Sequence, residues 1–228
     1  TLQNPVLFYP ELATIKNNER LPMVFVANTN IDSELQSAQY PPVIAPQTTF
    51  FEGLDTLAVE RRTTTQEFFE LLKNPDAAPL IYINCHADSR GIEDGGGPFA
   101  SKLRLSDGDV DIDKLDLRAP VLPSGLRNGP LIFLNACQSA ELTPYIYAGL
   151  VPALLQRGAR GVIGTEVNTP ALFAAEFAQT LIQRFAQGNQ PLGELLLEIR
   201  RDYLTTKNNV IGVVYALYSS GDLVVVRS

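Results

Sequence analysis

The chain contains one histidine, His86, and two cysteines, Cys85 and Cys137. Cys137 follows His86 by 51 residues, and each of the two comes directly after a short, mostly apolar stretch. A thiol with its ordinary pKa of about 8.5 is mostly protonated at neutral pH. An imidazole beside it can take the thiol proton to leave a nucleophilic thiolate, and can later protonate a leaving amine. His86 and Cys137 are therefore the first candidates for catalysis, and the chemistry they indicate is acyl transfer.

The stretches that must position these two residues, 80–84 and 131–135, are predicted to be buried strands because they are short and apolar. In open α/β sheets, functional groups gather at the carboxyl ends of the strands. If the two strands are neighbours, His86 and Cys137 meet at one edge of the sheet. Cys85 precedes His86 on its strand, so the two side chains point to opposite faces. We expect Cys85 to be a buried core thiol rather than the nucleophile.

Predicted strands and helices alternate along most of the chain. This order is typical of an α/β fold with a central, mostly parallel β-sheet flanked by helices. We expect loops over 30–50, 87–100 and 117–129, and a hairpin over 102–111. Further strands are predicted over 21–29, 161–165, 210–218 and 223–226, the last two joined by a turn, and helices over 64–74, 145–157, 170–187 and 191–205.

Two of these helices have recognisable start signals. Thr64 and Glu67 have the spacing of a capping box. Thr169 is expected to cap the helix whose first position is Pro170 and that ends before Gly188. Because periodic apolar residues follow both signals, we expect the helices to begin there.

Composition narrows the classes of function. The 228 residues, 45% hydrophobic and 19% charged, suit one core, and we expect a single domain over 1–228. A net charge of −7 disfavours binding to nucleic acid, and apolar runs such as Tyr145–Leu155 are too short to span a membrane. One His and two Cys are too few for a Cys/His zinc site, and we expect no metal and no cofactor. Two cysteines do not make a disulfide framework, which favours a reducing, cytoplasmic location.

Four blocks of sequence occur in order between residues 80 and 226. They are Ile81-Tyr82-Ile83-Asn84-Cys85-His86, Leu131-Ile132-Phe133-Leu134-Asn135-Ala136-Cys137-Gln138-Ser139-Ala140, Gly161-Val162-Ile163-Gly164-Thr165, and Tyr215-Ala216-Leu217-Tyr218 with Gly221-Asp222-Leu223. Together they resemble the CHAT domain, a caspase- and separase-like module often found with TPR repeats. Ala-Cys-Gln at 136–138, with a histidine about 50 residues upstream, also retains part of a caspase signature. Residues 1–79 are expected to form the N-terminal strand and helix of the same domain.

The resemblance implies a caspase-like fold and a cysteine endopeptidase with a His–Cys dyad. Cys137 would be the nucleophile and His86 the general acid and base, with the backbone N–H groups of Ala87 and Cys137 forming the oxyanion hole. CHAT domains usually have Gly where this chain has Ala87, and Ala keeps the N–H but loses the freedom of Gly at positive φ. The resemblance also implies a bacterial protein of defence or cell death, controlled by a flanking domain or a partner protein.

Three residues are candidates for contacting a protein or peptide substrate. Asn135, two residues before Cys137, is expected to help form the pocket for the side chain that precedes the scissile bond, and Asp88 adds negative potential. Glu166 follows the fourth strand, where a buried carboxylate would favour Arg or Lys in the substrate. A solvated acid near a helix N-terminus explains Glu166 equally well.

Other classes of function fit the sequence less well. The alternative to an active peptidase is an inactive CHAT fold that serves protein interaction, in which Ala87 would mark the loss of catalytic activity. The retention of His86 and Cys137 favours the peptidase. A nucleotide or flavin binder is disfavoured because Pro follows Gly95-Gly96-Gly97 and no Gly-Lys-[Ser/Thr] sequence occurs. A papain-type enzyme has its Cys before its His, which is the reverse of the order here.

Overall fold

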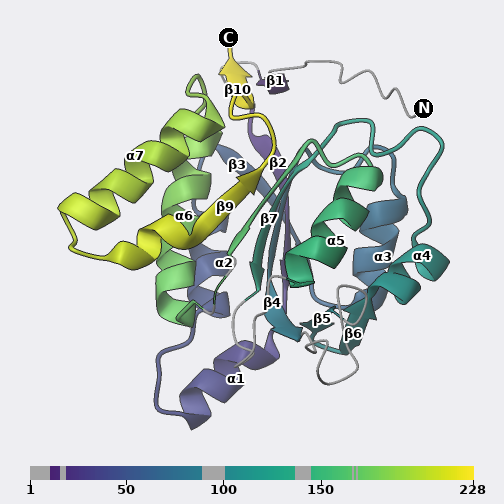
Figure 1. Cartoon of the computed structure of the whole chain (residues 1–228), viewed down its shortest axis with the longest axis horizontal. Helices are drawn as coiled ribbons and strands as arrows, with labels where there is room; N and C mark the ends of the chain where they lie inside the picture. Colours follow the sequence, from purple (N-terminus) through teal and green to yellow (C-terminus); the bar gives the residue numbers. More distant parts are fainter. Residues whose placement is uncertain (1–10, 16–18, 89–100, 137–144, 166, 168) are drawn as a thin grey trace.

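The structure, a computed structural model, describes residues 11–15, 19–88, 101–136, 145–165, 167 and 169–228. Its main sheet has the strand order β3-β2-β4-β7-β8-β9 (Figure 1). The first five of these strands are parallel, and β9 runs antiparallel to β8. The predicted α/β fold with a mostly parallel sheet is therefore confirmed. The strands are β2 (Leu21–Ala27), β3 (Leu57–Arg62), β4 (Leu80–Asp88), β7 (Leu131–Ala136), β8 (Gly161–Thr165) and β9 (Tyr215–Tyr218).

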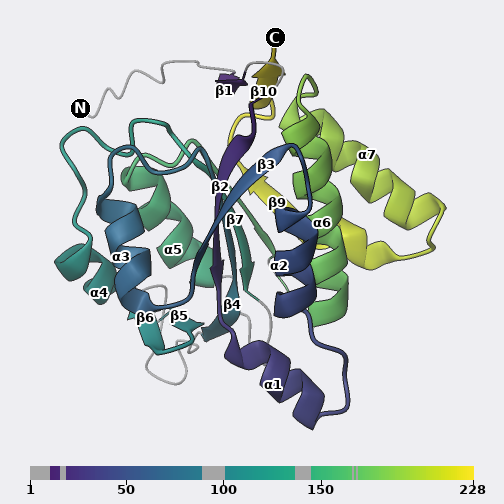
Figure 2. The same cartoon turned by 180° about the vertical axis from the view of Figure 1, so that it is seen from behind.

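Helices cover both faces of the sheet (Figure 1). One face carries α2 (Ile44–Glu52), α6 (Ala171–Gln187) and α7 (Leu192–Thr205), and the other carries α3 (Thr65–Lys73), α4 (Ile112–Arg118) and α5 (Tyr145–Gln156). Figure 2 shows from behind that β3 is an outer strand with α2 beside it. Within the described part of the chain, no helix has the length and apolar character needed to cross a membrane.

The alternation of side chains along each strand divides the core into two layers. On β4, Tyr82 faces the layer of α2 and α6, whereas Ile81, Ile83 and Cys85 face the layer of α3 and α5. Cys85 is fully buried, which confirms that it is a core thiol. All six residues of β7 are buried because this strand lies between β4 and β8 and under helices on both sides.

The predicted hairpin over 102–111 is present and extends the sheet. β5 (Lys102–Leu105) pairs antiparallel with β6 (Gly108–Asp111) and with the last three residues of β4. β4 therefore runs past the ends of its parallel neighbours, and His86 lies opposite Arg104 of the hairpin.

The prediction of a loop over 30–50 is wrong, since this segment forms α1 (Asn30–Ser37) and α2 with the adjacent prolines between them. The carboxylate of Asp32 accepts hydrogen bonds from the backbone N–H groups of Val43, Ile44 and Ala45 at 2.7, 2.7 and 2.9 Å. Asp32 thereby satisfies the free N–H groups at the start of α2 from a distance of 11 to 13 residues, which local patterns do not reveal.

The C-terminal strands also differ from the prediction. Residues 210–214 form a 3₁₀-helix (Val210–Val214) before β9, and the Asn209 side chain accepts from the N–H of Ile211 at its start. β10 (Val224–Arg227) pairs in parallel with β1 (Glu11–Ile15) in a separate two-stranded sheet and is not paired with β9. β1 and β3 were not predicted, and β3 is partly exposed and ends in the charged sequence Glu60-Arg61-Arg62.

One of the two helix start signals is confirmed. The Thr64 hydroxyl accepts from the N–H of Glu67, and the Glu67 carboxylate accepts from the N–H of Thr64, as a capping box requires. Thr169 does not cap α6, because its hydroxyl donates to the carbonyl of Val167. The loop predicted over 117–129 begins later, since α4 continues to Arg118.

Candidate active site

The carboxyl ends of β2, β4, β7 and β8 lie together at the lower edge of the sheet in Figure 1, beside α1. In the register of β4 and β7, Asn84 lies opposite Asn135 and Cys85 opposite Ala136. His86 follows directly on β4. Cys137 and Glu166 lie outside the described residues, as does the side chain of Asp88.

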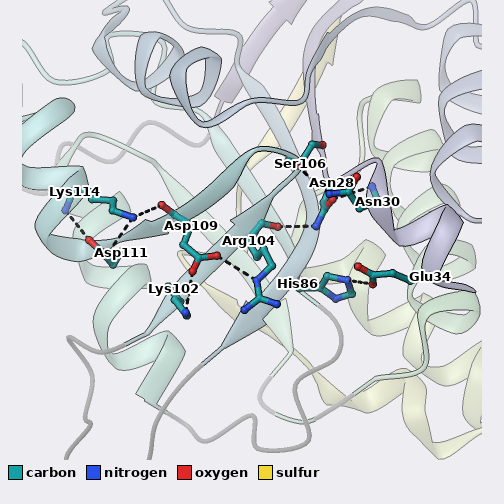
Figure 3. A network of polar contacts seen from close by, with 10 residues as sticks. All are labelled: Asn28, Asn30, Glu34, His86, Lys102, Arg104, Ser106, Asp109, Asp111 and Lys114. Atoms are coloured by element: carbon teal, nitrogen blue, oxygen red, sulfur yellow. Dashed lines mark hydrogen bonds and ion pairs between the residues drawn. The ribbon is translucent and has the colours of Figure 1, made fainter.

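His86 contacts a carboxylate that the sequence did not indicate. Its side chain is 12% exposed, and its Nε2 lies 2.5 Å from Oε2 of Glu34, whose own side chain is 53% exposed (Figure 3). Glu34 belongs to α1, 52 residues before His86 and within the segment predicted to be a loop. No sequence signal joins the two residues, because only the folded arrangement of α1 against β4 brings them together.

Hydrogen bonds from the β5–β6 hairpin hold the start of α1 (Figure 3). The side chain of Asn28, which is 1% exposed, donates to the carbonyl of Arg104 at 3.0 Å. The hydroxyl of Ser106 accepts from the backbone N–H of Thr29 at 2.9 Å, and the carbonyl of Ser106 accepts from the Asn30 side chain at 3.0 Å. The helix that carries Glu34 and the hairpin that pairs with His86 are thus joined directly.

Ala87 lies in regular strand structure, is 1% exposed and pairs with Leu103. Its φ is not in the left-handed region, so this position does not require the freedom of Gly. The carbonyl of Asn84 accepts from the N–H of Asn28 on the β2 side of the strand. Because backbone groups alternate along a strand, the N–H of Ala87 points to the opposite side, toward β7.

Asn135 is fully buried and bonded within the protein. Its Nδ2 donates to the hydroxyl of Tyr82 at 3.1 Å and to the carbonyl of Ala174 at 3.0 Å, and its Oδ1 accepts from the hydroxyl of Tyr215 at 3.1 Å. These bonds join the end of β7 to β4, α6 and β9. The Asn135 amide therefore holds the end of this strand.

Gln47 of α2 extends this buried network, and the sequence had not singled it out. Its Nε2 donates to the hydroxyl of Tyr82 at 3.0 Å and its Oε1 accepts from Nδ2 of Asn84 at 2.7 Å. The polar side chains at the ends of β4 and β7 consequently have partners on the helix layer below them, which fixes both strand ends.

A family model described as the CHAT domain matches residues 22–218. The chain belongs to the CHAT domain family. The match begins at residue 22, well before the blocks at 80–226 that carry the sequence resemblance. The chain is also 31% identical over 180 residues to a protein of Vitiosangium sp. (strain GDMCC 1.1324) named "Probable protease", covering 75% of this chain and 22% of that protein. The chain thus spans about a fifth of the length of this relative.

Among solved structures, the CHAT domain is similar to caspase-1 from Spodoptera frugiperda, with 14% identity and a TM-score of 0.47 over 96% of this chain and 93% of the caspase chain. It is similar to the pro-form of that caspase, with 14% identity and a TM-score of 0.41 over 96% of this chain and 97% of the other.

A cluster of charged residues lies on the hairpin beside His86 of the CHAT domain (Figure 3). Asp109 accepts from Lys102 at 2.8 Å and from Arg104 at 3.2 Å. Burial raises the pKa of Asp109, but the hydrogen bonds from Lys102 and Arg104 outweigh it and hold that pKa below its ordinary value of 3.8. Asp109 therefore stays ionised at neutral pH and engages the guanidinium of Arg104, which is the cation nearest in register to His86.

An apolar hollow of about 230 Å³ lies between the end of α1 and the start of α6 of the CHAT domain. It is lined by Leu35 and Tyr40, which follow Glu34, and by the start of α6 at residues 170–172. Tyr40 is 58% and Leu172 44% exposed, so apolar surface is open to a ligand there.

Proposed function

We propose that the chain is a cysteine endopeptidase in which Cys137 is the nucleophile and His86 the general acid and base. The observation that carries the proposal is the register of β4 and β7, in which Cys85 lies opposite Ala136. In the sequence, His86 comes directly after Cys85 and Cys137 directly after Ala136. By the alternation of side chains, His86 lies on the face of β4 that Tyr82 shares, and we propose that the thiol of Cys137 meets it at this edge of the sheet.

The chemistry is acyl transfer. His86 takes the thiol proton, and the thiolate attacks the substrate carbonyl to form a tetrahedral oxyanion. The C–N bond breaks as the imidazolium gives its proton to the leaving amine. Water, deprotonated by His86, then attacks the thioester, and the acid product leaves as the thiol is restored.

The oxyanion hole is proposed to consist of the backbone N–H groups of Ala87 and Cys137. The direction of the Ala87 N–H toward β7, and its ordinary strand conformation, support this assignment. The absence of a left-handed φ at Ala87 also removes the reason for treating Ala in place of Gly as a sign of lost activity.

The substrate is proposed to be a protein or peptide, bound with Glu166 and Asp88 near its scissile bond. An acidic pair there would favour a basic residue before the bond. Asn135 contributes by holding the end of β7, because its amide is buried and bonded to Tyr82, Ala174 and Tyr215.

The Vitiosangium relative named as a protease supports the class of reaction. We further propose that residues 1–228 form one domain, that a flanking domain or partner protein controls it, and that it acts in the cytoplasm in bacterial defence or cell death. The continuous sheet from β3 to β9, with one core layer on each face, supports the single domain.

The test is active-site labelling with acyloxymethyl ketone probes that carry Arg, Leu or Asp, followed by peptide mass spectrometry. We expect an adduct on Cys137, formed at least about 100-fold more slowly in His86→Ala. Cys85→Ala is the matched control, because Cys85 is buried in the core and its variant should label as the native chain does.

The probe that reacts fastest tests the specificity. A preference for Arg would support a role for Glu166, and a preference for Leu would assign recognition to the apolar hollow beside α1 instead. A folded chain that forms no Cys137 adduct and cleaves no peptide would contradict the proposal and favour a CHAT domain that serves only protein interaction.

A further inference from the structure

We propose that Glu34 is a positioning residue for His86: its carboxylate keeps the imidazole proton on Nε2 and leaves Nδ1 to accept the proton of the nucleophile. This inference rests on the proposed function. It adds to the His–Cys dyad a residue of α1 that acts through the histidine without touching the substrate.

The chemistry of the contact fixes the roles of the two ring nitrogens. An ionised carboxylate has no hydrogen to donate, so it can only accept a hydrogen bond. Nε2 of His86, 2.5 Å from Oε2 of Glu34, must therefore carry the proton. A neutral imidazole has one N–H, and consequently its free electron pair is on Nδ1.

Glu34 lies on a helix whose first turn is held by two sets of hydrogen bonds. Thr29 and Asn30 bond to Ser106 of the hairpin. In the same turn, the Asp32 carboxylate accepts from the backbone N–H groups at the start of α2. A carboxylate orients a ring effectively only when its own backbone is held, and α1 meets this condition.

The backbone of His86 is held by the same hairpin, because His86 pairs with Arg104 of β5. Charged groups of the described residues on this side include Glu34, Arg104 and the Lys102–Asp109 pair. Arg104 donates to Asp109 at 3.2 Å, whereas Glu34 contacts the ring of His86.

The expected effect is on turnover rather than on substrate binding. When Nδ1 takes the thiol proton, the ring becomes a cation next to the Glu34 carboxylate, which stabilises the thiolate–imidazolium pair. Because the Glu34 side chain is 53% exposed, water screens this charge and the effect is smaller than for a buried triad acid. We expect Glu34→Ala to lower kcat about 10-fold and leave KM nearly unchanged.

The first measurement is independent of activity. His86 is the only histidine of the chain, so ¹H–¹⁵N spectra of protein with ¹⁵N-labelled histidine report on this ring alone. We expect the neutral ring to be protonated on Nε2, and that preference to weaken in Glu34→Ala. It should persist in Glu34→Gln, which keeps an acceptor oxygen but no charge. A native ring protonated on Nδ1 would overturn the inference.

The second measurement is peptide cleavage by the same variants. Glu34→Gln should retain more activity than Glu34→Ala, and Gln36→Ala, an exposed position on the same helix, should behave as the native chain. Thermal unfolding of each variant by circular dichroism separates loss of fold from loss of turnover. A folded Glu34→Ala with native kcat would overturn the inference while leaving the peptidase intact. A native chain whose Cys137 reacts with no probe would instead refute the proposed function.

Discussion

Asn135→Ala should lower the free energy of unfolding by about 3 kcal/mol. The change removes the hydrogen bonds to Tyr82, Ala174 and Tyr215 at a fully buried position. Each bond contributes about 1 kcal/mol net, and the cavity left by the amide adds to the loss. In a domain of this size, a loss of about 3 kcal/mol should lower Tm by roughly 6 to 12 °C.

The Tyr215 hydroxyl allows one of these bonds to be measured separately. Tyr215→Phe should cost about 1 kcal/mol, because it deletes the donor to Asn135 Oδ1 at 3.1 Å and keeps the ring stacked on Phe177. In the double variant the two losses should not add, and the coupling energy should be about 1 kcal/mol. Tyr40→Phe, at an exposed tyrosine, should add independently to Asn135→Ala.

The assay is urea unfolding followed by circular dichroism, which suits a chain without tryptophan. The free energy of unfolding is obtained by linear extrapolation at constant m-value. A coupling energy below about 0.3 kcal/mol between positions 135 and 215 would mean that the hydrogen bond contributes nothing, and the reasoning on the buried network would be refuted.

Two further predictions concern positions away from the site. Gly158→Ala should lower the free energy of unfolding by about 2 kcal/mol or more, because φ is +102° and a Cβ would lie 2.6 Å from the backbone nitrogen of Leu126. Hydrogen bonds from the N–H groups of Thr63 and Thr64 hold the pKa of Glu67 below its ordinary value of 4.5. The ionised carboxylate therefore contributes to the free energy of unfolding above pH 4.5, and this contribution is lost as the pH falls through the lower pKa of the folded state. Glu67→Gln should therefore destabilise the chain at pH 7 by less than about 1 kcal/mol, and the difference should vanish in acid urea titrations.

Each of these has a control. Gly108→Ala, where a Cβ meets only a methyl group of Thr65 at 3.7 Å, should cost less than Gly158→Ala, and equal losses would contradict the argument from backbone strain. A Glu67→Gln effect that stays constant from pH 7 to pH 3 would show that the charge on Glu67 is not what stabilises the start of α3.

The central strands could be predicted from sequence because their apolar composition reflects burial on both faces. Residues 80–84 and 131–135 are strands and are neighbours, and the ends of parallel strands are where His86 and Asn135 were expected. The outer strand β3 was missed, because an edge strand is partly exposed and its charged residues hide the pattern.

The contacts around the site could be predicted less well than the strands. Glu34 and Gln47 lie in a segment whose prolines indicate a loop. Glu34 contacts His86, 52 residues further along the chain, and Gln47 contacts Asn84, 37 residues further along. Such contacts depend on how α1 and α2 pack, and nothing in local sequence encodes that. Whether Asn135 contacts a substrate depends on how far its side chain is buried, which the apolar pattern of a strand does not specify.

The order of strands divides the main sheet at a single seam between β4 and β7. Every strand of the main sheet that comes before residue 119 lies on one side of this seam, and every one that comes after residue 130 lies on the other, whereas the separate β1–β10 pair joins the two ends of the chain. Cutting the backbone in the connection 119–130 would therefore produce two contiguous fragments, one with Glu34 and His86 and the other with Cys137. Neither fragment alone would carry both of the proposed reacting groups, so the chain is suited to fragment complementation, in which the proposed peptidase activity would return only when the two pieces reassemble along β4 and β7 and along β1 and β10.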